Sequence, residues 1–234
     1  MSSTASTVVV TGASGNLGRA VADGFAAGGA NLVLIASRRE SLAPAFGGED
    51  ATRLFAPADL RERGQVDAAV RAAIERFGRI DVLCNIAGGF RMGTPVHETP
   101  DADWDFLIDI NVRTLLNMVR AVVPHMLAAG RGRIINVGAH AALKGVAGMG
   151  AYCAAKSAVI RITEAMAAEL REKNVNVNCV LPTIIDTPEN RAAMPAADPA
   201  RWVSPADLAR VFLFLASDEA SAIHGAAISV SGLS

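Results

Sequence analysis

Short runs of apolar and β-branched residues alternate with longer amphipathic stretches along this chain of 234 residues. Strands that are apolar throughout need cover on both faces, and strands that alternate with helices pair in parallel. The alternation therefore predicts one α/β domain over residues 1–234, a doubly wound Rossmann-type sheet of seven parallel strands with helices on both faces. The expected strands are Thr7–Gly12, Asn31–Ser37, Thr52–Pro57, Ile80–Gly88, Gly132–Gly138, Val175–Pro182 and Ala226–Gly232.

The stretches between these strands have the spacing of helices. The segment 182–205 lacks that spacing and is rich in proline. Long irregular segments in compact domains are more often functional than not, so we expect a lid there. The expected helices are Gly15–Ala27, Glu62–Phe77, Asp103–Ala128, Gly150–Lys173 and Pro205–Ser217.

Composition excludes several classes of function. Hydrophobic residues make up 51% of the chain and charged residues 19%, which supports a large core. A formal net charge of −1 gives no basic surface for nucleic acid or an anionic membrane. No apolar run reaches bilayer length, and the N-terminus lacks the basic start of a signal peptide. Three widely spaced cysteines form no zinc or disulfide pattern, so we expect a cytoplasmic protein without a metal.

The first expected strand runs into a glycine-rich turn, "TGASGNLGRA". Gly12 permits a tight turn, Gly15 lets a phosphate approach the backbone, and Gly18 allows close helix–strand packing. The following helix start offers free N–H groups and a positive dipole to a pyrophosphate. The sequence therefore predicts a dinucleotide site whose contacts are Gly12, Ser14, Gly15, Asn16, Leu17 and Gly18.

The end of the second strand bears on the choice of dinucleotide. A carboxylate there would accept hydrogen bonds from the adenosine ribose, but this strand ends in Ser37 and Arg38, followed by Arg39. A guanidinium can bind a 2′-phosphate, so NADP(H) is favoured over NAD(H). The alternative is that these arginines only solvate a helix start.

Tyr152 and Lys156 lie four positions apart in an expected helix and so share one face. A lysine ammonium beside a phenol favours the phenolate and lowers its pKa, which makes tyrosine a usable proton donor. No serine or threonine occurs between Val137 and Ala151 to help polarise a substrate oxygen.

Six motifs in this order resemble the short-chain dehydrogenase/reductase superfamily over essentially the whole chain. Besides the glycine turn they are "ADL" with Asp59, "NIAG" at 85–88, Asn111 in "INV", the Tyr152–Lys156 pair, and "LPTIIDTP" at 181–188. The resemblance implies hydride transfer between a nicotinamide cofactor and a small-molecule substrate.

The resemblance also implies individual roles. Tyr152 would donate the proton, Lys156 would bind the nicotinamide ribose and depress the tyrosine pKa, and Asn111 would hold a relay water. The implied cofactor contacts are Asp59 and Leu60 by the adenine; Asn85, Ala87 and Gly88 along the central strand; Tyr152 and Lys156; and Pro182, Thr183, Ile185 and Thr187, of which Thr187 would contact the carboxamide.

Three positions depart from the commonest pattern. Asn16 and Thr183 stand where glycine is usual, and Ala139 stands at the place of the catalytic serine, thirteen residues before Tyr152. The dihydropteridine reductase subgroup resembles this chain in "GASGNLG", "CNIAGGF", "GAHAALKGVAGMGAY" and "LPTIIDTPENRAAMP" and also lacks the serine. Its quinonoid substrate accepts hydride readily, which would make a missing oxyanion donor less costly.

Six residues are candidates for the substrate site. Their loops follow strand ends, where doubly wound folds bind ligands. His140 could replace the missing hydroxyl or could point elsewhere, and the apolar candidates could wall a pocket or pack in the core. The candidates are Phe90, Ala139, His140, Met149, Met194 and Trp202.

Three functions remain open at this point: a reductase or dehydrogenase acting on a carbonyl, alcohol or imine-like carbon, a quinonoid dihydropteridine reductase-like enzyme, and a non-catalytic dinucleotide sensor.

The expected helices Asp103–Ala128 and Gly150–Lys173 are apolar on more than one face. Superfamily members associate through these helices, so we expect a homodimer or homotetramer.

Overall fold

A seven-stranded sheet forms the centre of the computed structural model, which describes residues 5–234. Its order is β3-β2-β1-β4-β5-β6-β7, and every neighbouring pair is parallel. This confirms the predicted single Rossmann-type domain. The strands are β1 (Thr7–Thr11), β2 (Asn31–Ile35), β3 (Arg53–Phe55), β4 (Val82–Asn85), β5 (Gly132–Val137), β6 (Val175–Pro182) and β7 (Ala227–Val230).

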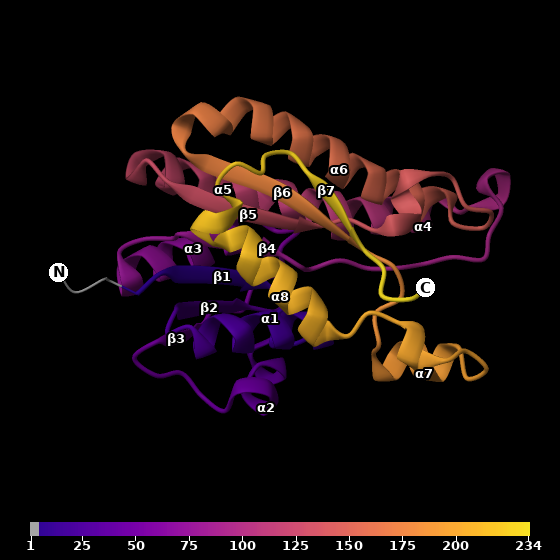
Figure 1. Cartoon of the computed structure of the whole chain (residues 1–234), viewed down its shortest axis with the longest axis horizontal. Coiled ribbons are helices and arrows are strands. Elements are labelled where there is room, and N and C mark those ends of the chain that lie inside the picture. The colour runs from indigo at the N-terminus through magenta and orange to yellow at the C-terminus, as the bar shows by residue number, and fades with distance from the viewer. Residues whose placement is uncertain (1–4) are drawn as a thin grey trace.

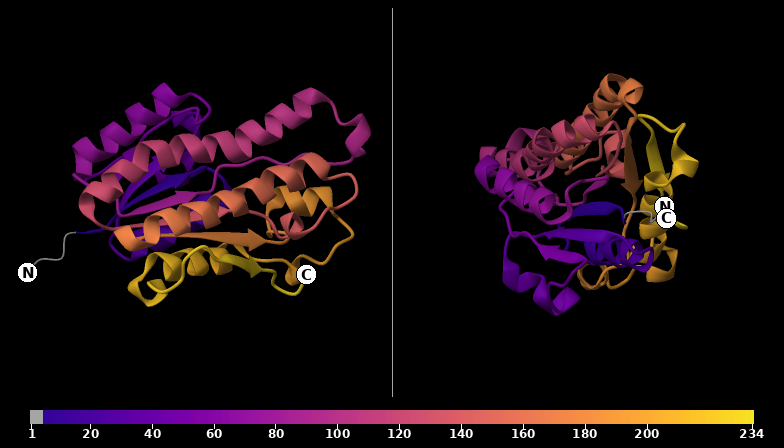
Figure 2. Two further views of the ribbon diagram at one scale, coloured as in Figure 1. Left: turned by 90° about the horizontal axis from the view of Figure 1, so that it is seen from above. Right: turned by 90° about the vertical axis from the view of Figure 1, so that its left-hand side faces the viewer.

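Helices cover the sheet on both sides (Figures 1 and 2). On one face α1 (Asn16–Ala27) packs beside α8 (Pro205–Ala216), and on the other lie α3 (Arg63–Phe77), α5 (Thr114–Ala129) and α6 (Gly150–Leu170). Among residues 5–234, no helix is both long and apolar enough to cross a membrane. Three shorter helices are α2 (Ala43–Phe46), α4 (Asp101–Ile108) and α7 (Pro188–Ala193).

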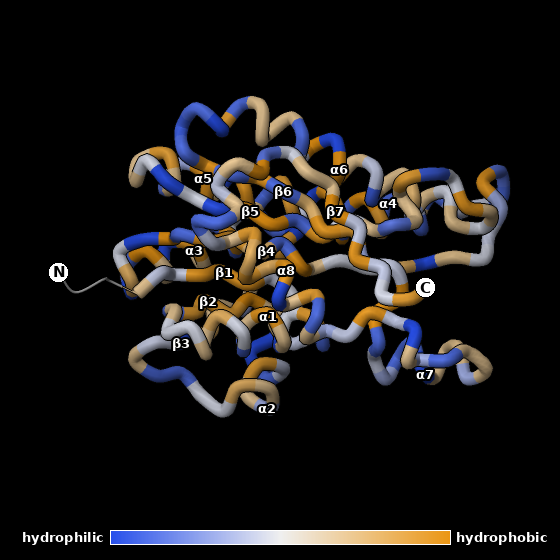
Figure 3. Tube along the Cα trace, in the orientation of Figure 1, coloured by the Kyte–Doolittle hydropathy of each residue, from blue (hydrophilic) through white to orange (hydrophobic). Residues whose placement is uncertain are grey.

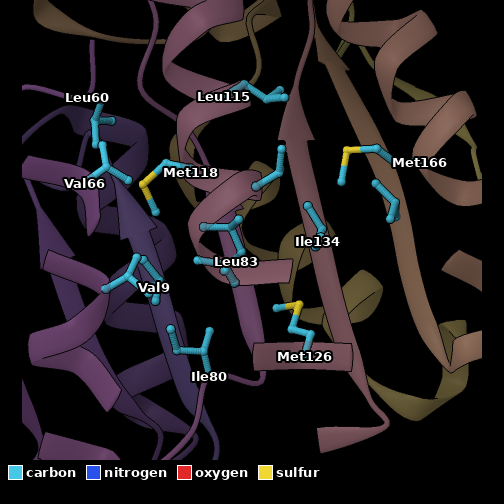
Figure 4. Packing of buried hydrophobic residues seen from close by; sticks show 14 of the residues in the cluster. Val9, Leu60, Val66, Ile80, Leu83, Leu115, Met118, Met126, Ile134 and Met166 are labelled. Atoms are coloured by element: carbon cyan, nitrogen blue, oxygen red, sulfur yellow. The ribbon is translucent and has the colours of Figure 1, made fainter. Parts of the chain in front are cut away.

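Alternating side chains of the strands build two cores. Val8 and Val10 of β1 join the core under α1 and α8, and Val9 joins the core under α3, α5 and α6 (Figure 4). Both sets are fully buried, which is why the strands are apolar throughout (Figure 3).

The long helix expected at Asp103–Ala128 is interrupted. A π-helical turn, Asp109–Arg113, separates α4 from α5. Within it the Asn111 side chain donates a hydrogen bond to the Leu107 carbonyl, 3.0 Å away, and so competes with the backbone pattern of the helix. The expected lid 182–205 is likewise more regular than predicted, because it contains α7 and a 3₁₀ turn at Pro199–Arg201.

The topology fixes where a ligand can bind. The chain builds outward from β1 to β3 on one side of the sheet and from β4 to β7 on the other. Doubly wound folds bind ligands outside the carboxyl ends of the strands, at the point where this order reverses. Those ends face the side of the molecule where α4 and α7 lie (right in Figure 1).

Candidate active site and dinucleotide cleft

The glycine turn after β1 has the shape of a phosphate cradle. Gly12 has φ +63°, and a Cβ there would lie 3.0 Å from the Ala87 nitrogen. A Cβ on Gly18 would lie 2.2 Å from the Gly12 oxygen, so only glycine fits. No side chain caps the start of α1 at Gly15, which leaves its first N–H groups for a ligand. The turn therefore fits the pyrophosphate of a dinucleotide.

Thr11, which the sequence reading missed, ties this turn to the loop after β4. Its hydroxyl oxygen accepts hydrogen bonds from the backbone N–H groups of Ile86 (2.9 Å) and Ala87 (3.1 Å). The hydroxyl donates to the Cys84 carbonyl, 3.3 Å away. The loop containing Asn85, Ala87 and Gly88 thereby lies next to the glycine turn.

The loop after β3 is held from α5. The buried Asn117 amide donates to the carbonyls of Leu60 (2.9 Å) and Arg61 (3.1 Å). The Asp59 carboxylate pairs with the Arg61 guanidinium, which lowers the pKa of that carboxyl. Asn117 is a second residue that the sequence reading missed, since its spacing alone gives no sign of this contact.

The two arginines after β2 differ in their surroundings. The Arg39 guanidinium pairs with Glu49 and lies 5.7 Å from the Phe55 ring centroid. Ser37 and Arg38 are exposed, and within residues 5–234 the Arg38 side chain has no hydrogen-bond or ion-pair partner. Arg38 is thus the arginine available to a ligand.

Asn111 and Lys156 meet at Gly88. A Cβ on Gly88 would lie 2.8 Å from the Asn111 Oδ1 and 3.2 Å from the Lys156 Nζ. The Asn111 amide also exchanges hydrogen bonds with the backbone of Gly89, at 3.1 and 3.0 Å. The π-helical turn in this way places Asn111 beside Lys156.

The electrostatics of Tyr152 and Lys156 differ from the expectation. Burial, the larger cause, and the neighbouring Cys153 together raise the pKa of the Tyr152 hydroxyl to about 12. Burial lowers the pKa of Lys156 to about 8, and its Nζ donates to the Val137 carbonyl at 2.8 Å. The prediction that Lys156 depresses the pKa of Tyr152 is therefore wrong for the protein alone. Tyr152 stays protonated at neutral pH.

A buried chain of polar groups holds α6, the helix that carries Tyr152 and Lys156, against the sheet. The Asn136 amide of β5 donates to the Thr163 hydroxyl oxygen of α6, 2.9 Å away. Asn136 in turn accepts from the Asn85 amide of β4, also at 2.9 Å. Thr163 lies two helical turns after Lys156, and Asn136 directly precedes Val137. The Asn136–Thr163 and Val137–Lys156 hydrogen bonds therefore hold the same face of α6 against β5.

Ala139 lies at the start of the loop after β5, buried and extended. Two side chains of α6 hold this loop: Cys153 donates to the Ala141 carbonyl and Ser157 to the Ala142 carbonyl. The Nδ1 of His140 lies 3.3 Å from the Ser229 hydroxyl of β7. The structure therefore favours the alternative in which His140 points elsewhere than toward Tyr152.

Two of the apolar substrate candidates lie beside Tyr152. The Phe90 ring meets the Tyr152 ring edge-on at 4.8 Å between centroids and is 54% exposed. Met149 and Tyr152 line one shallow depression. Trp202 is only 8% exposed, which favours the alternative that it packs in the core. Met194 follows the end of α7 and does not line that depression.

The segment 182–205, the expected lid, is held by several hydrogen bonds near its start after β6. The Thr183 hydroxyl lies within hydrogen-bond distance of the Ser231 carbonyl and the Ser234 hydroxyl, which ties Pro182–Thr183 to the end of the chain. Thr187 caps α7, and the Asn190 amide donates to the Ile185 carbonyl at 2.8 Å.

Three buried cysteines, Cys84, Cys153 and Cys179, form no disulfide, and residues 5–234 contain no cluster of His, Cys, Asp and Glu that could hold a metal.

A parallel doubly wound sheet, a glycine cradle and a Tyr–Lys pair at the same edge define a dinucleotide-dependent oxidoreductase. Residues 6–197 match the family model described as short chain dehydrogenase. The chain belongs to this short-chain dehydrogenase family, and it is accordingly an oxidoreductase of the NAD(P)-dependent type.

Named relatives align with nearly the whole chain. The chain is 34% identical to D-threitol dehydrogenase of Mycolicibacterium smegmatis, over 96% of this chain and 90% of the relative. It is 35% identical to 2-(R)-hydroxypropyl-CoM dehydrogenase of Xanthobacter autotrophicus, over 96% of each chain. The crystal structure of 3-ketoacyl-(acyl-carrier-protein) reductase from Brucella melitensis complexed with NADH superposes with a TM-score of 0.87 at 30% identity, over 97% of each chain.

Proposed function

We propose that this protein transfers hydride between NAD(P)(H) and a carbonyl, alcohol or imine-like carbon of a small molecule, with Tyr152 as the proton donor. The observations that carry the proposal are the meeting of Lys156 and Asn111 at Gly88, in the loop beside the glycine turn, and the place of Tyr152 one turn before Lys156 on α6. When bound, the dinucleotide supplies the hydride-carrying nicotinamide.

The chain's own residues hold and move the proton. Burial keeps the Tyr152 hydroxyl protonated at neutral pH, so it can give its proton to a substrate oxygen or nitrogen. With a pKa of about 8, Lys156 is mostly charged at pH 7 and stabilises the phenolate that remains. Asn111 lies beside Lys156 at Gly88. In this proposal it holds the relay water through which a proton returns to Tyr152.

NADP(H) is the preferred cofactor in this proposal. Arg38 is exposed and unpaired among residues 5–234, whereas Arg39 is already paired with Glu49. Replacing Arg38 with glutamine should weaken NADPH binding about tenfold and leave NADH binding unchanged, because a charged hydrogen bond to a phosphate is lost. Arg39→Gln is the matched control. Equal effects of the two substitutions on NADPH binding would contradict the assignment.

A quinonoid dihydropterin is the second candidate substrate. The loop after β5 offers Ala139 in place of a serine, and the nearby Cys153 and Ser157 already donate to loop carbonyls. Loss of one oxyanion donor typically costs about 10²–10³ in rate, and an activated acceptor tolerates that loss better than a plain ketone. A non-catalytic sensor would not need Asn111, Tyr152 and Lys156 together, which argues against the third alternative.

The decisive experiment measures initial rates of NADPH and NADH oxidation with quinonoid dihydrobiopterin and with a reactive diketone. Tyr152→Phe is the control: it should lose most turnover while binding the cofactor normally. Turnover of the pterin alone supports the dihydropteridine reductase-like function. Turnover of the diketone supports the broader reductase function, and cofactor binding without any turnover supports the sensor.

We also propose that the protein acts in the cytoplasm as a homodimer or homotetramer. Half-buried apolar side chains, Leu116, Val123 and Ile162, remain on α5 and α6. Burying such side chains against a second copy is favourable. Light scattering that gives the mass of one 24.2 kDa chain at micromolar concentration would contradict the oligomer.

A further inference from the structure

One side chain of the lid reaches across to the glycine turn. The Glu189 carboxylate, in the first turn of α7, accepts a hydrogen bond from the Asn16 amide at 2.9 Å. The Thr187 hydroxyl also donates to this carboxylate. Asn16 and Glu189 are 173 residues apart in the sequence, so this contact joins the two sides of the cleft.

Both donors are among the cofactor contacts expected from the sequence. Asn16 is the first residue of α1, at the helix end that fits a pyrophosphate. Thr187 is the residue proposed to contact the nicotinamide carboxamide. A carboxylate and a phosphate are both anions that accept hydrogen bonds, so they compete for the same donors.

The local charges leave Glu189 as an anion at this place. Its pKa lies below the ordinary value because its own backbone N–H, Thr187 and Asn16 donate to the carboxylate. Arg191, the cation in the same helix, is already paired with Asp186 through two hydrogen bonds of 2.6 and 2.8 Å. No residue of the lid helix other than Glu189 carries a negative charge.

We infer that Glu189 is an internal competitor of the dinucleotide: its carboxylate holds Asn16 and Thr187 while the cleft is free, and it must withdraw before the pyrophosphate and carboxamide can take those donors. The inference rests on the proposed function. It makes Glu189 a residue that weakens cofactor affinity and favours release of the spent cofactor.

The test compares the NADPH affinity of the unmodified full chain with that of its variants. Affinity is measured by nicotinamide fluorescence, a binding signal that requires no turnover. Glu189→Ala should tighten binding about two- to fivefold at low salt, the range expected for one exposed charge interaction. Glu189→Gln keeps the shape and removes the charge, so it should give much of the same gain. The gain should shrink at 0.5 M salt, where charges are screened within a few Å.

Asp198→Asn is the matched control, because Asp198 is an exposed lid carboxylate that caps the Pro199–Arg201 turn instead of facing Asn16. Its NADPH affinity should equal that of the unmodified chain. If Glu189→Ala binds NADPH no more tightly than the unmodified chain and unfolds at the same temperature, the inference is wrong while the proposed function stands. Failure of every variant and of the unmodified chain to bind NADPH or NADH overturns the proposed function as well.

Discussion

The hydrogen bond between Asn136 and Thr163 should measurably stabilise the packing of α6 against the sheet. Replacing Thr163 with valine keeps the branched shape and creates no cavity, but it leaves the Asn136 amide without its acceptor. Both residues are fully buried, at 0% and 1% exposure, so the amide cannot turn to water. An orphaned buried donor costs about 1–3 kcal/mol of unfolding free energy.

Thr114→Val is the control, because the Thr114 hydroxyl is equally buried but donates only to the Ile110 carbonyl in its own helix. No other side chain loses a partner there, so the change should stay within about 0.5 kcal/mol. For a chain of this size, a loss of about 2 kcal/mol corresponds to about 4–8 °C in Tm. Urea and thermal unfolding followed by tryptophan fluorescence measure both. Equal losses in the two variants would refute the reasoning.

The remaining predictions concern the turn, the loop and the lysine. Gly18→Ala should lower the unfolding free energy by about 1–3 kcal/mol and abolish NADPH binding, because its Cβ would lie 2.2 Å from the Gly12 oxygen; a normal Tm with normal binding would contradict this. Ala139→Ser should raise kcat on simple ketones at least about tenfold by supplying a hydroxyl, and no gain would mean that the pocket sets the substrate class. Burial lowers the pKa of Lys156 from 10.5 to about 8, so between those values the unfolded chain binds more protons and the unfolding free energy should rise with pH, by on the order of 3 kcal/mol. Lys156→Met should remove this rise in urea unfolding at pH 7.5 and 10.

The sequence determined the architecture because strand burial leaves a strong local pattern. Each strand predicted from a run of apolar residues is present, and β6 has the predicted bounds Val175–Pro182. The glycine turn was equally readable, since only glycine tolerates the positive φ of Gly12 and the close approach at Gly18. The Tyr152–Lys156 pair followed from helical spacing.

Other features depend on residues far apart in the chain, and only the tertiary structure decided them. The π-helical turn at Asn111 arises from side-chain contacts to Leu107 and Gly89, which the apolar spacing of a helix does not encode. Burial, a property of the whole fold, raised the pKa of Tyr152 where the local lysine predicted a decrease.

The same reason explains the residues that were missed or misassigned. Thr11, Asn117 and Glu189 act on partners that lie between 56 and 173 positions away, so no local pattern marks them. Trp202 looked available from its irregular segment but packs in the core. A sequence determines local geometry through spacing and backbone preference, whereas contacts across the cleft exist only after the strands bring their loops to one edge.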